Sequence, residues 1–127
     1  MGGAVSLDGL LSANGLAGQG ASGGGSGGGS GGGILLIAQS LAGTGSLTAN
    51  GGAGGEWGGG GGGGRISVTT KNVDAWFGTL RVNGAHGGGY TNADGAAGTL
   101  SMQVVPEPAT GALVALVGSL LLRRRRA

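Results

Sequence analysis

Apolar and polar residues alternate in short segments that recur along the chain. Leu80 and Val82 alternate with Arg81 and Asn83, and the same period of two occurs in residues 65–70. Alternation of this kind is typical of a β-strand with one buried face. We therefore predict strands near residues 34–38, 46–50, 65–70, 79–83 and 99–105.

Two interleaved motifs repeat at nearly constant spacing. The pentapeptide Leu-Ser-Ala-Asn-Gly at Leu11 returns in similar form at Leu47 and Leu80, at spacings of 36 and 33 residues. Repeats of this length indicate an architecture in which successive units stack on one another. A second apolar motif alternates with the pentapeptide and recurs at Ile34, Ile66 and Leu100.

Each repeat therefore contains a strand, a short connection, a second strand that ends in Asn-Gly, and a glycine-rich loop. Asn-Gly tolerates positive φ and predicts a turn of the chain. Glycine follows it each time instead of an alternating strand, which favours the corner of a solenoid over a hairpin. We expect an all-β fold of parallel β-solenoid-like repeats, and antiparallel pairing of these strands would exclude it.

Glycine supplies 37 of the 127 residues and is concentrated in the loops at 23–33, 58–64 and 84–98. Such segments behave as flexible linkers when they are free. The sequence is compatible both with partly disordered loops and with packed polyglycine layers on one side of the strands. The aromatic residues are too few for a thick core. Trp57, Trp76 and Tyr90 are candidates for stacking on sugars. Trp76 and Phe77 are expected instead to plug the core or a corner, which leaves Trp57 as the main exposed candidate.

The C-terminal segment has a different composition. Residues 109–122 carry no charge and would form a helix about 21 Å long. A hydrocarbon core is about 30 Å thick, so spanning requires that the following arginine side chains snorkel or that Val104 and Val105 join the helix. Consecutive arginines resist translocation, which predicts a transmembrane segment with the body outside. We divide the chain into a repeat region, 1–104, and a C-terminal segment, 105–127.

The tripeptide Pro106-Glu107-Pro108 is followed by the apolar segment 109–122 and then by the cluster Arg123–Arg126. This order resembles the PEP-CTERM sorting signal, which is also labelled the ice-binding protein C-terminal domain. The resemblance implies that an exosortase acts as partner, cleaves near the tripeptide and passes the body to the cell surface or extracellular matrix. An unprocessed tail anchor is the alternative. The implied processing motif is Pro106, Glu107 and Pro108, and the implied cytoplasmic stop-transfer residues are Arg123, Arg124, Arg125 and Arg126.

The body resembles the glycine-rich repeat regions of large bacterial adhesin-like surface proteins with a right-handed parallel β-helix. The resemblance rests on the Leu-x-Ala-Asn-Gly motif and the glycine-rich spacers. Residues 1–20 contain no basic residue and no continuous apolar run, so they do not form a signal peptide. We therefore expect the chain to be the C-terminal piece of a longer protein.

Charge and composition exclude several classes of function. The net charge is +2, but four of the seven basic residues stand in the tail, so a nucleic-acid partner is not expected. There is no cysteine, and His86 is the only histidine. We expect no catalytic residues, no metal and no cofactor, because the carboxylates occupy non-equivalent repeat positions. Residues 92–95 have only a weak resemblance to a calcium loop.

The favoured function is that of an exported bacterial surface or extracellular-matrix protein. Its role would be structural or adhesive, near extracellular polysaccharide. One alternative is an ice-binding module, which would need a row of outward threonines, although only Thr48, Thr69, Thr70 and Thr99 are available. The other is the C-terminal fragment of a β-helical polysaccharide-degrading enzyme, which would need a carboxylate cluster on one face.

Overall fold

A computed structural model describes residues 3–90, 93–106 and 118–120 of the chain. The described part is rich in β-strands, and its two main sheets are parallel. The strands are β1 (Ala4–Ser6), β2 (Leu10–Ser12), β3 (Gly20–Ala21), β4 (Gly24–Gly25), β5 (Gly33–Gly43), β6 (Ser46–Thr48), β7 (Arg65–Trp76), β8 (Thr79–Arg81) and β9 (Thr99–Val104).

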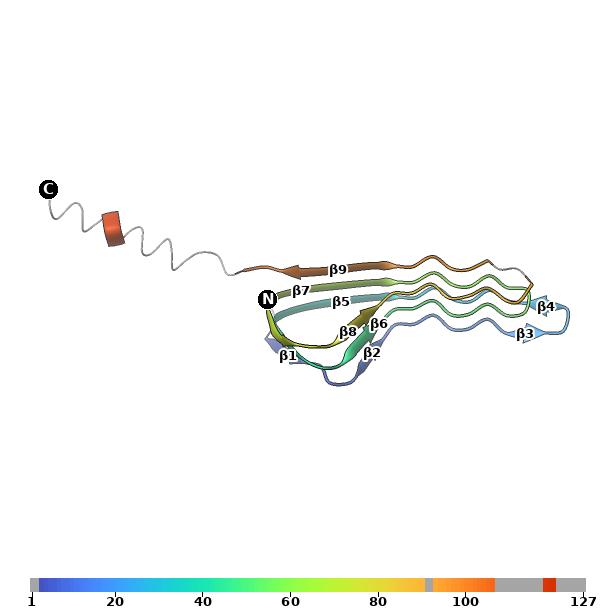
Figure 1. The fold of residues 1–127 in the computed structure, drawn as a ribbon, viewed down its shortest axis with the longest axis horizontal. Coiled ribbons are helices and arrows are strands. Elements are labelled where there is room, and N and C mark those ends of the chain that lie inside the picture. The colour runs from blue at the N-terminus through green and yellow to red at the C-terminus, as the bar shows by residue number, and fades with distance from the viewer. Residues whose placement is uncertain (1–2, 91–92, 107–117, 121–127) are drawn as a thin grey trace.

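The two main sheets take alternate strands of the chain. One sheet has the order β1-β5-β7-β9 and the other has the order β2-β6-β8, and every pairing in both is parallel (Figure 1). The predicted parallel pairing is therefore confirmed. The repeat spacing also gives the register: Ile34 pairs with Ile66, which pairs with Leu100, and Leu47 pairs with both Leu11 and Leu80.

The predicted strand positions are confirmed, but several bounds are wrong. β5 continues to Gly43 and β7 to Trp76, beyond the predicted ends at 38 and 70. The register between these strands shifts between Ser40 and Ala42. A bulge of this kind interrupts the alternation of apolar and polar residues, so a pattern of period two cannot reveal the second half of either strand.

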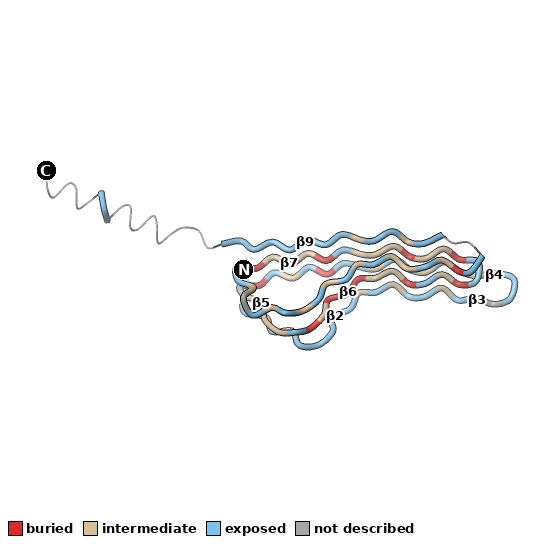
Figure 2. The backbone as a smooth tube through the Cα atoms, viewed as in Figure 1, coloured by how far each residue is buried: buried red, intermediate tan, exposed pale blue. Residues whose placement is uncertain are grey.

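The side-chain core lies between the two sheets. Figure 2 shows buried positions along β5, β6 and β7 and also in the glycine-rich segments. Leu41, Leu47, Ile66 and Val68 are each at most 1% exposed and belong to one cluster. Burial of such a side chain contributes about 1.5–3 kcal/mol. Trp76 packs against this cluster, as predicted. The prediction is wrong for Phe77, which is 78% exposed because it follows the end of β7.

The glycine-rich segments run beside one another beyond one end of the two main sheets and reach the β3–β4 hairpin (Figure 1). Gly28 and Gly31 donate to the carbonyl groups of residues 59 and 62, and Gly60 and Gly63 donate to those of residues 93 and 96. Donors that recur every third residue indicate helices of the polyproline II type, which have three residues per turn and no internal hydrogen bonds. We call the six segments 13–19, 26–32, 49–55, 58–64, 82–88 and 93–98 the glycine bundle.

Backbones in the glycine bundle pack directly against one another. A Cβ atom at Gly61 would overlap the carbonyl oxygen of Gly29, and one at Gly98 would overlap that of Gly64. Only glycine fits where backbones approach this closely. Of the two alternatives that the sequence leaves open, the structure therefore has packed polyglycine layers.

The six segments form three layers: 13–19 with 26–32 is the first, 49–55 with 58–64 is the middle one, and 82–88 with 93–98 is the third. The outer layers carry side chains at positions where the middle layer has glycine. Gly60 and Gly63 of the middle layer would overlap carbonyl groups of the third layer if they carried a Cβ atom. The equivalent residues of the third layer are Asp94 and Ala97, both exposed. In the first layer, Leu16 is 84% exposed. The glycine pattern thus follows the presence of a neighbouring layer.

The Asn-Gly pairs join the layers and do not form the predicted turns. Asn50 donates its backbone N–H to Oδ1 of Asn14 (2.7 Å), and Asn83 donates its own to Oδ1 of Asn50 (2.8 Å). Positive φ occurs among the described glycines only at Gly23 and Gly43. The turn prediction is therefore wrong, because the side chains of Asn14 and Asn50 each accept the N–H of the asparagine in the next layer while the chain continues into the bundle.

Candidate functional site

The C-terminal segment leaves the sheet at a defined residue. Val105 donates its N–H to the carbonyl oxygen of Thr70 (2.8 Å), which continues the pairing of β9 with β7 by one residue. Pro106 follows, is exposed and has no N–H to donate. The proline therefore ends the ladder where the predicted processing motif begins.

Most of the predicted sorting segment lies outside the described residues. This applies to Glu107 and Pro108, to most of the predicted 109–122 helix, and to the four terminal arginines. Residues 118–120 are helical. Within the described part of the chain, no helix has the length and apolar character needed to cross a membrane.

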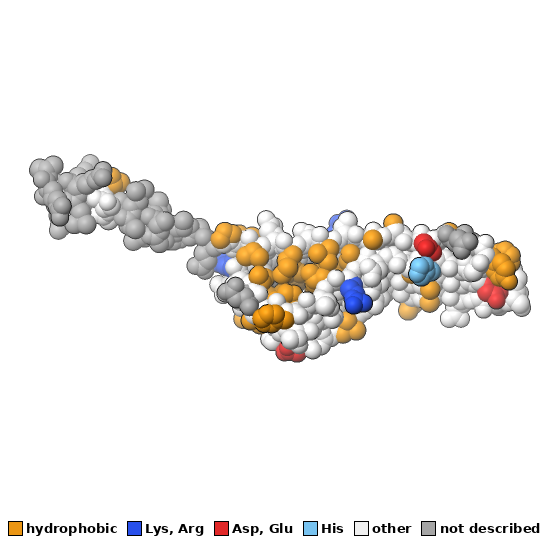
Figure 3. Space-filling model, viewed as in Figure 1, with side chains coloured by type: hydrophobic (Ala, Val, Ile, Leu, Met, Phe, Trp, Pro, Cys, Tyr) orange, Lys and Arg blue, Asp and Glu red, His pale blue; other side chains and the backbone are white. Residues whose placement is uncertain are grey.

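Apolar side chains remain at the surface beside Val105 and Pro106, the point that we call the exit of the chain. Leu100, Met102 and Val104 follow the inward row of β7 but are 46%, 40% and 45% exposed. The second sheet ends at β8, so no described strand lies opposite β9. Figure 3 shows this apolar surface between β9 and β8.

The end of the glycine bundle lies opposite the exit of the chain. β9 runs from the bundle to the exit, whereas the hairpin of β3 and β4 closes the far end (Figure 1). Glu56 and Trp57 lie beside that hairpin, against Gly20 and Gly25. We call Glu56, Trp57 and Tyr90 the aromatic tip.

The two aromatic rings of the tip stack on each other. The centroids of Trp57 and Tyr90 are 4.4 Å apart, and the ring planes differ by 12°. The side chains are nevertheless 51% and 68% exposed. Stacked aromatic rings of this kind combine a flat apolar face with a polar edge. The sequence suggested both residues as sugar platforms but not their contact, which the repeat spacing of 33 residues could have indicated.

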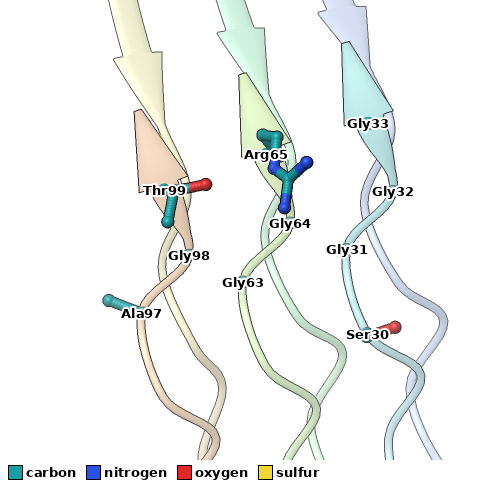
Figure 4. Close-up of a pocket in the computed structure, with 10 residues that line it drawn as sticks. All are labelled: Ser30, Gly31, Gly32, Gly33, Gly63, Gly64, Arg65, Ala97, Gly98 and Thr99. Carbon is teal, nitrogen blue, oxygen red and sulfur yellow. The ribbon is translucent and has the colours of Figure 1, made fainter. Parts of the chain in front are cut away.

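A shallow groove crosses three strands where the sheet meets the bundle (Figure 4). It has a volume of about 540 Å³, and its floor is largely the backbone of residues 31–33, 63–64 and 98. Ser30, Arg65 and Thr99 supply its polar side chains. Arg65 pairs in register with Gly33 and Thr99, and its guanidinium makes no ion pair with the described residues. Sequence reasoning did not select Arg65, because a single cation in a strand forms no motif.

The only histidine binds a carboxylate on the third layer of the bundle. Asp94 Oδ1 accepts the N–H of Gly87 (3.0 Å), and Asp94 Oδ2 lies 3.2 Å from His86 Nδ1. The hydrogen bond from Gly87, followed by that from His86, lowers the pKa of Asp94. Both side chains are exposed, at 57% for Asp94 and 92% for His86. The pair joins the two segments of the third layer.

The remaining acidic groups and threonines are dispersed. Asp8 lies between β1 and β2, at the strand end of the body, where it accepts the N–H of Thr44, whereas Glu56 and Asp94 lie in the glycine-rich end. Among the described residues, no three His, Asp or Glu side chains could hold a metal ion together. Thr48 is 9% exposed and Thr70 is fully buried, so neither contributes to an outward threonine row.

No family model, curated protein or solved structure matches the chain.

Proposed function

We propose that the chain is an exported bacterial protein that an exosortase sorts to the cell surface or extracellular matrix, where it has a structural or adhesive role. The observation that carries the proposal is the exit of the chain at Pro106. The pairing of β9 with β7 reaches Val105, immediately before the Pro-Glu-Pro tripeptide, and Pro106 lies at the end of the described body opposite the aromatic tip.

The proposed fold is a β-solenoid followed by a transmembrane helix at residues 109–122. The parallel sheets support the solenoid, and so does the pairing of equivalent repeat residues such as Ile34, Ile66 and Leu100. The uncharged run and the arginine cluster support the helix. A body of this kind would hold its aromatic tip away from the membrane to which the tail is attached.

The proposed mechanism of sorting follows from the cost of moving charge through a membrane. Each arginine costs a few kcal/mol at the bilayer centre, so four of them stop translocation. The stalled chain would present Pro106, Glu107 and Pro108 at the outer surface. Pro106 and Pro108 keep this segment out of a helix, and Glu107 gives the exosortase one charged group to recognise.

The test follows the size of the protein in a bacterial host that has a matching exosortase. Glu107→Ala should leave insertion intact but block trimming, whereas the control Glu56→Ala changes an exposed carboxylate at the other end of the body and should be trimmed normally. Replacement of Arg123–Arg126 by glutamine should release unprocessed protein. If the Glu107→Ala protein is trimmed as fast as the parent, the tripeptide is not the recognition element and the segment is an ordinary tail anchor.

A further inference from the structure

The outward face of β7 carries both cations of this strand. Ile66, Val68 and Thr70 point into the core and are at most 1% exposed. Side chains of a strand alternate between its faces, so the residues between them point outward together with Arg65 and Lys71. At about 3.3 Å per residue, Arg65 and Lys71 lie about 20 Å apart on this face. The outward row of β7 is Arg65, Ser67, Thr69 and Lys71.

Three hollows follow this outward row. The first is the groove around Arg65 in Figure 4. The second lies between Leu35, Arg65 and Ser67 and has a volume of about 480 Å³. The third is lined by Gln39, Ser40, Lys71 and Asn72 and has a volume of about 340 Å³. We call the three hollows together the β7 trough, and none of the described residues that line it is Asp or Glu.

The chemistry of the first hollow suits a carboxylate. A guanidinium presents a planar pair of N–H donors that binds a carboxylate through two parallel hydrogen bonds. The glycine floor leaves room for a ligand to approach Arg65, and the hydroxyl groups of Ser30 and Thr99 lie along the same hollow. Lys71 adds a second positive charge, but it already interacts within the protein. Arg65 is therefore the principal anion-binding group of the trough.

The shape of the trough suits an extended polymer. Small molecules bind in concave pockets that cover most of their surface, whereas these hollows are shallow and lie in a row. Nucleic acid is a poor fit, because single strands require aromatic residues for stacking, and the exposed Trp57 and Tyr90 lie at the tip. Excluding the arginine-rich tail, residues 1–105 carry three basic and four acidic residues, so attraction of an anion must be local to the trough.

We propose that the β7 trough binds a linear acidic polysaccharide and that Arg65 forms paired hydrogen bonds with a uronic-acid carboxylate. The proposal deepens the adhesive role described above, since it names the class of ligand. It does not depend on processing by an exosortase, because the trough belongs entirely to the folded body.

The test measures binding of the detergent-solubilised full chain to polygalacturonate. The terminal arginines also attract polyanions, so all proteins carry glutamine in place of Arg123–Arg126. Arg65→Gln should weaken binding at least about tenfold, since a hydrogen bond to a charged group contributes that much. Arg65→Lys should recover only part of the affinity, because lysine cannot bind in the paired geometry. Arg81→Gln removes an exposed arginine of β8, outside the trough, and should bind like the parent.

Two further measurements separate the proposal from its competitors. Neutral dextran and carboxyl-reduced polygalacturonate should not bind, and binding should weaken as salt increases. Glu107→Ala should retain binding, so failure of the sorting proposal and failure of this one are distinguishable. Equal binding by the Arg65→Gln protein would overturn the proposal, and so would an equal loss in the Arg81→Gln protein, which would indicate a general charge effect. Circular dichroism confirms that each variant remains folded.

Discussion

The strand half and the glycine half of the molecule are built from the same three repeats but are held together differently. In the strand half, side chains such as Leu47 and Ile66 fill the space between two sheets. In the glycine bundle, backbones occupy that space, and hydrogen bonds that recur every third residue join each segment to its neighbours. Stability therefore depends on the size of side chains in one half and on their absence in the other.

The balance of free energies differs in the same way. Burial of apolar area stabilises the strand half. Ordering a glycine costs more backbone entropy than ordering any other residue, and each backbone hydrogen bond contributes only about 0.5–1.5 kcal/mol net. The bundle consequently requires that nearly all of its amides be bonded and that its close contacts be preserved.

The largest expected effect is loss of a core side chain in the strand half. Leu47→Ala should lower the free energy of unfolding by about 2–5 kcal/mol, because Leu47 is fully buried and its truncation leaves a cavity. Urea denaturation of the full chain measures this change. Leu16→Ala removes the same atoms from a leucine that is 84% exposed and should change stability by less than about 0.5 kcal/mol. Similar losses for both variants would contradict the location of the core.

The next effect comes from adding a methyl group to the glycine bundle. Gly63→Ala should destabilise the protein by about 1–3 kcal/mol, because its Cβ atom would overlap the carbonyl oxygen of Val82. The chain contains its own control, since the equivalent residue of the third layer is already Ala97. Ala97→Gly should cost less than about 1 kcal/mol in the same urea measurement. A neutral Gly63→Ala variant would show that the layers are not in direct contact.

A smaller effect is expected where the two halves meet, at the asparagine ladder that Asn14, Asn50 and Asn83 form through their hydrogen bonds. Asn50→Ala leaves the N–H of Asn83 without its 2.8 Å acceptor and should cost about 1 kcal/mol. Asn83→Ala is the matched control, because no described backbone N–H donates to the side chain of Asn83. Thermal unfolding of both variants measures the difference. Equal melting temperatures would remove the ladder as a source of stability.

The smallest effect concerns pH and the third layer of the bundle. Hydrogen bonds from Gly87 and His86 hold the pKa of Asp94 below its ordinary value of 3.8. A carboxylate with a lowered pKa stabilises the folded state above its unfolded pKa, and this contribution is lost as pH falls through the folded pKa. The free energy of unfolding should therefore show a small decrease as the pH falls below about 4. The Asp94→Asn variant should show a smaller decrease. An unchanged acid dependence in the variant would assign the effect to other carboxylates.

The sequence predicts the strand half much better than the glycine half. The recurrence of Ile34, Ile66 and Leu100 predicts the strands and their register, because inward side chains must stack on equivalent neighbours. Glycine has no side chain whose pattern could reveal a period of three, so order in the bundle cannot be predicted in that way. One signal is present nonetheless: the third layer has Asp94 and Ala97 where the middle layer has glycine.

The candidate sites also differ in how well the sequence predicts them. The proposed sorting signal can be suggested from the sequence alone, because it combines a tripeptide, an apolar run and an arginine cluster. The contact of Trp57 with Tyr90 can be predicted from the sequence only if the repeat spacing is also applied to residues outside the strands. The groove of Arg65 depends on glycines of three neighbouring segments and on a cation that belongs to no motif, so only the structure reveals it.

Amide hydrogen exchange of the glycine residues, measured by NMR, tests the central claim most directly. The claim is that the glycine-rich segments form a packed bundle that extends the folded body. Gly52 and Gly61 donate to carbonyl groups of neighbouring segments, so their amides should exchange many times more slowly than that of the exposed Gly89. Exchange of all three at the rate of an unstructured peptide would show that the segments are flexible loops and would contradict the account.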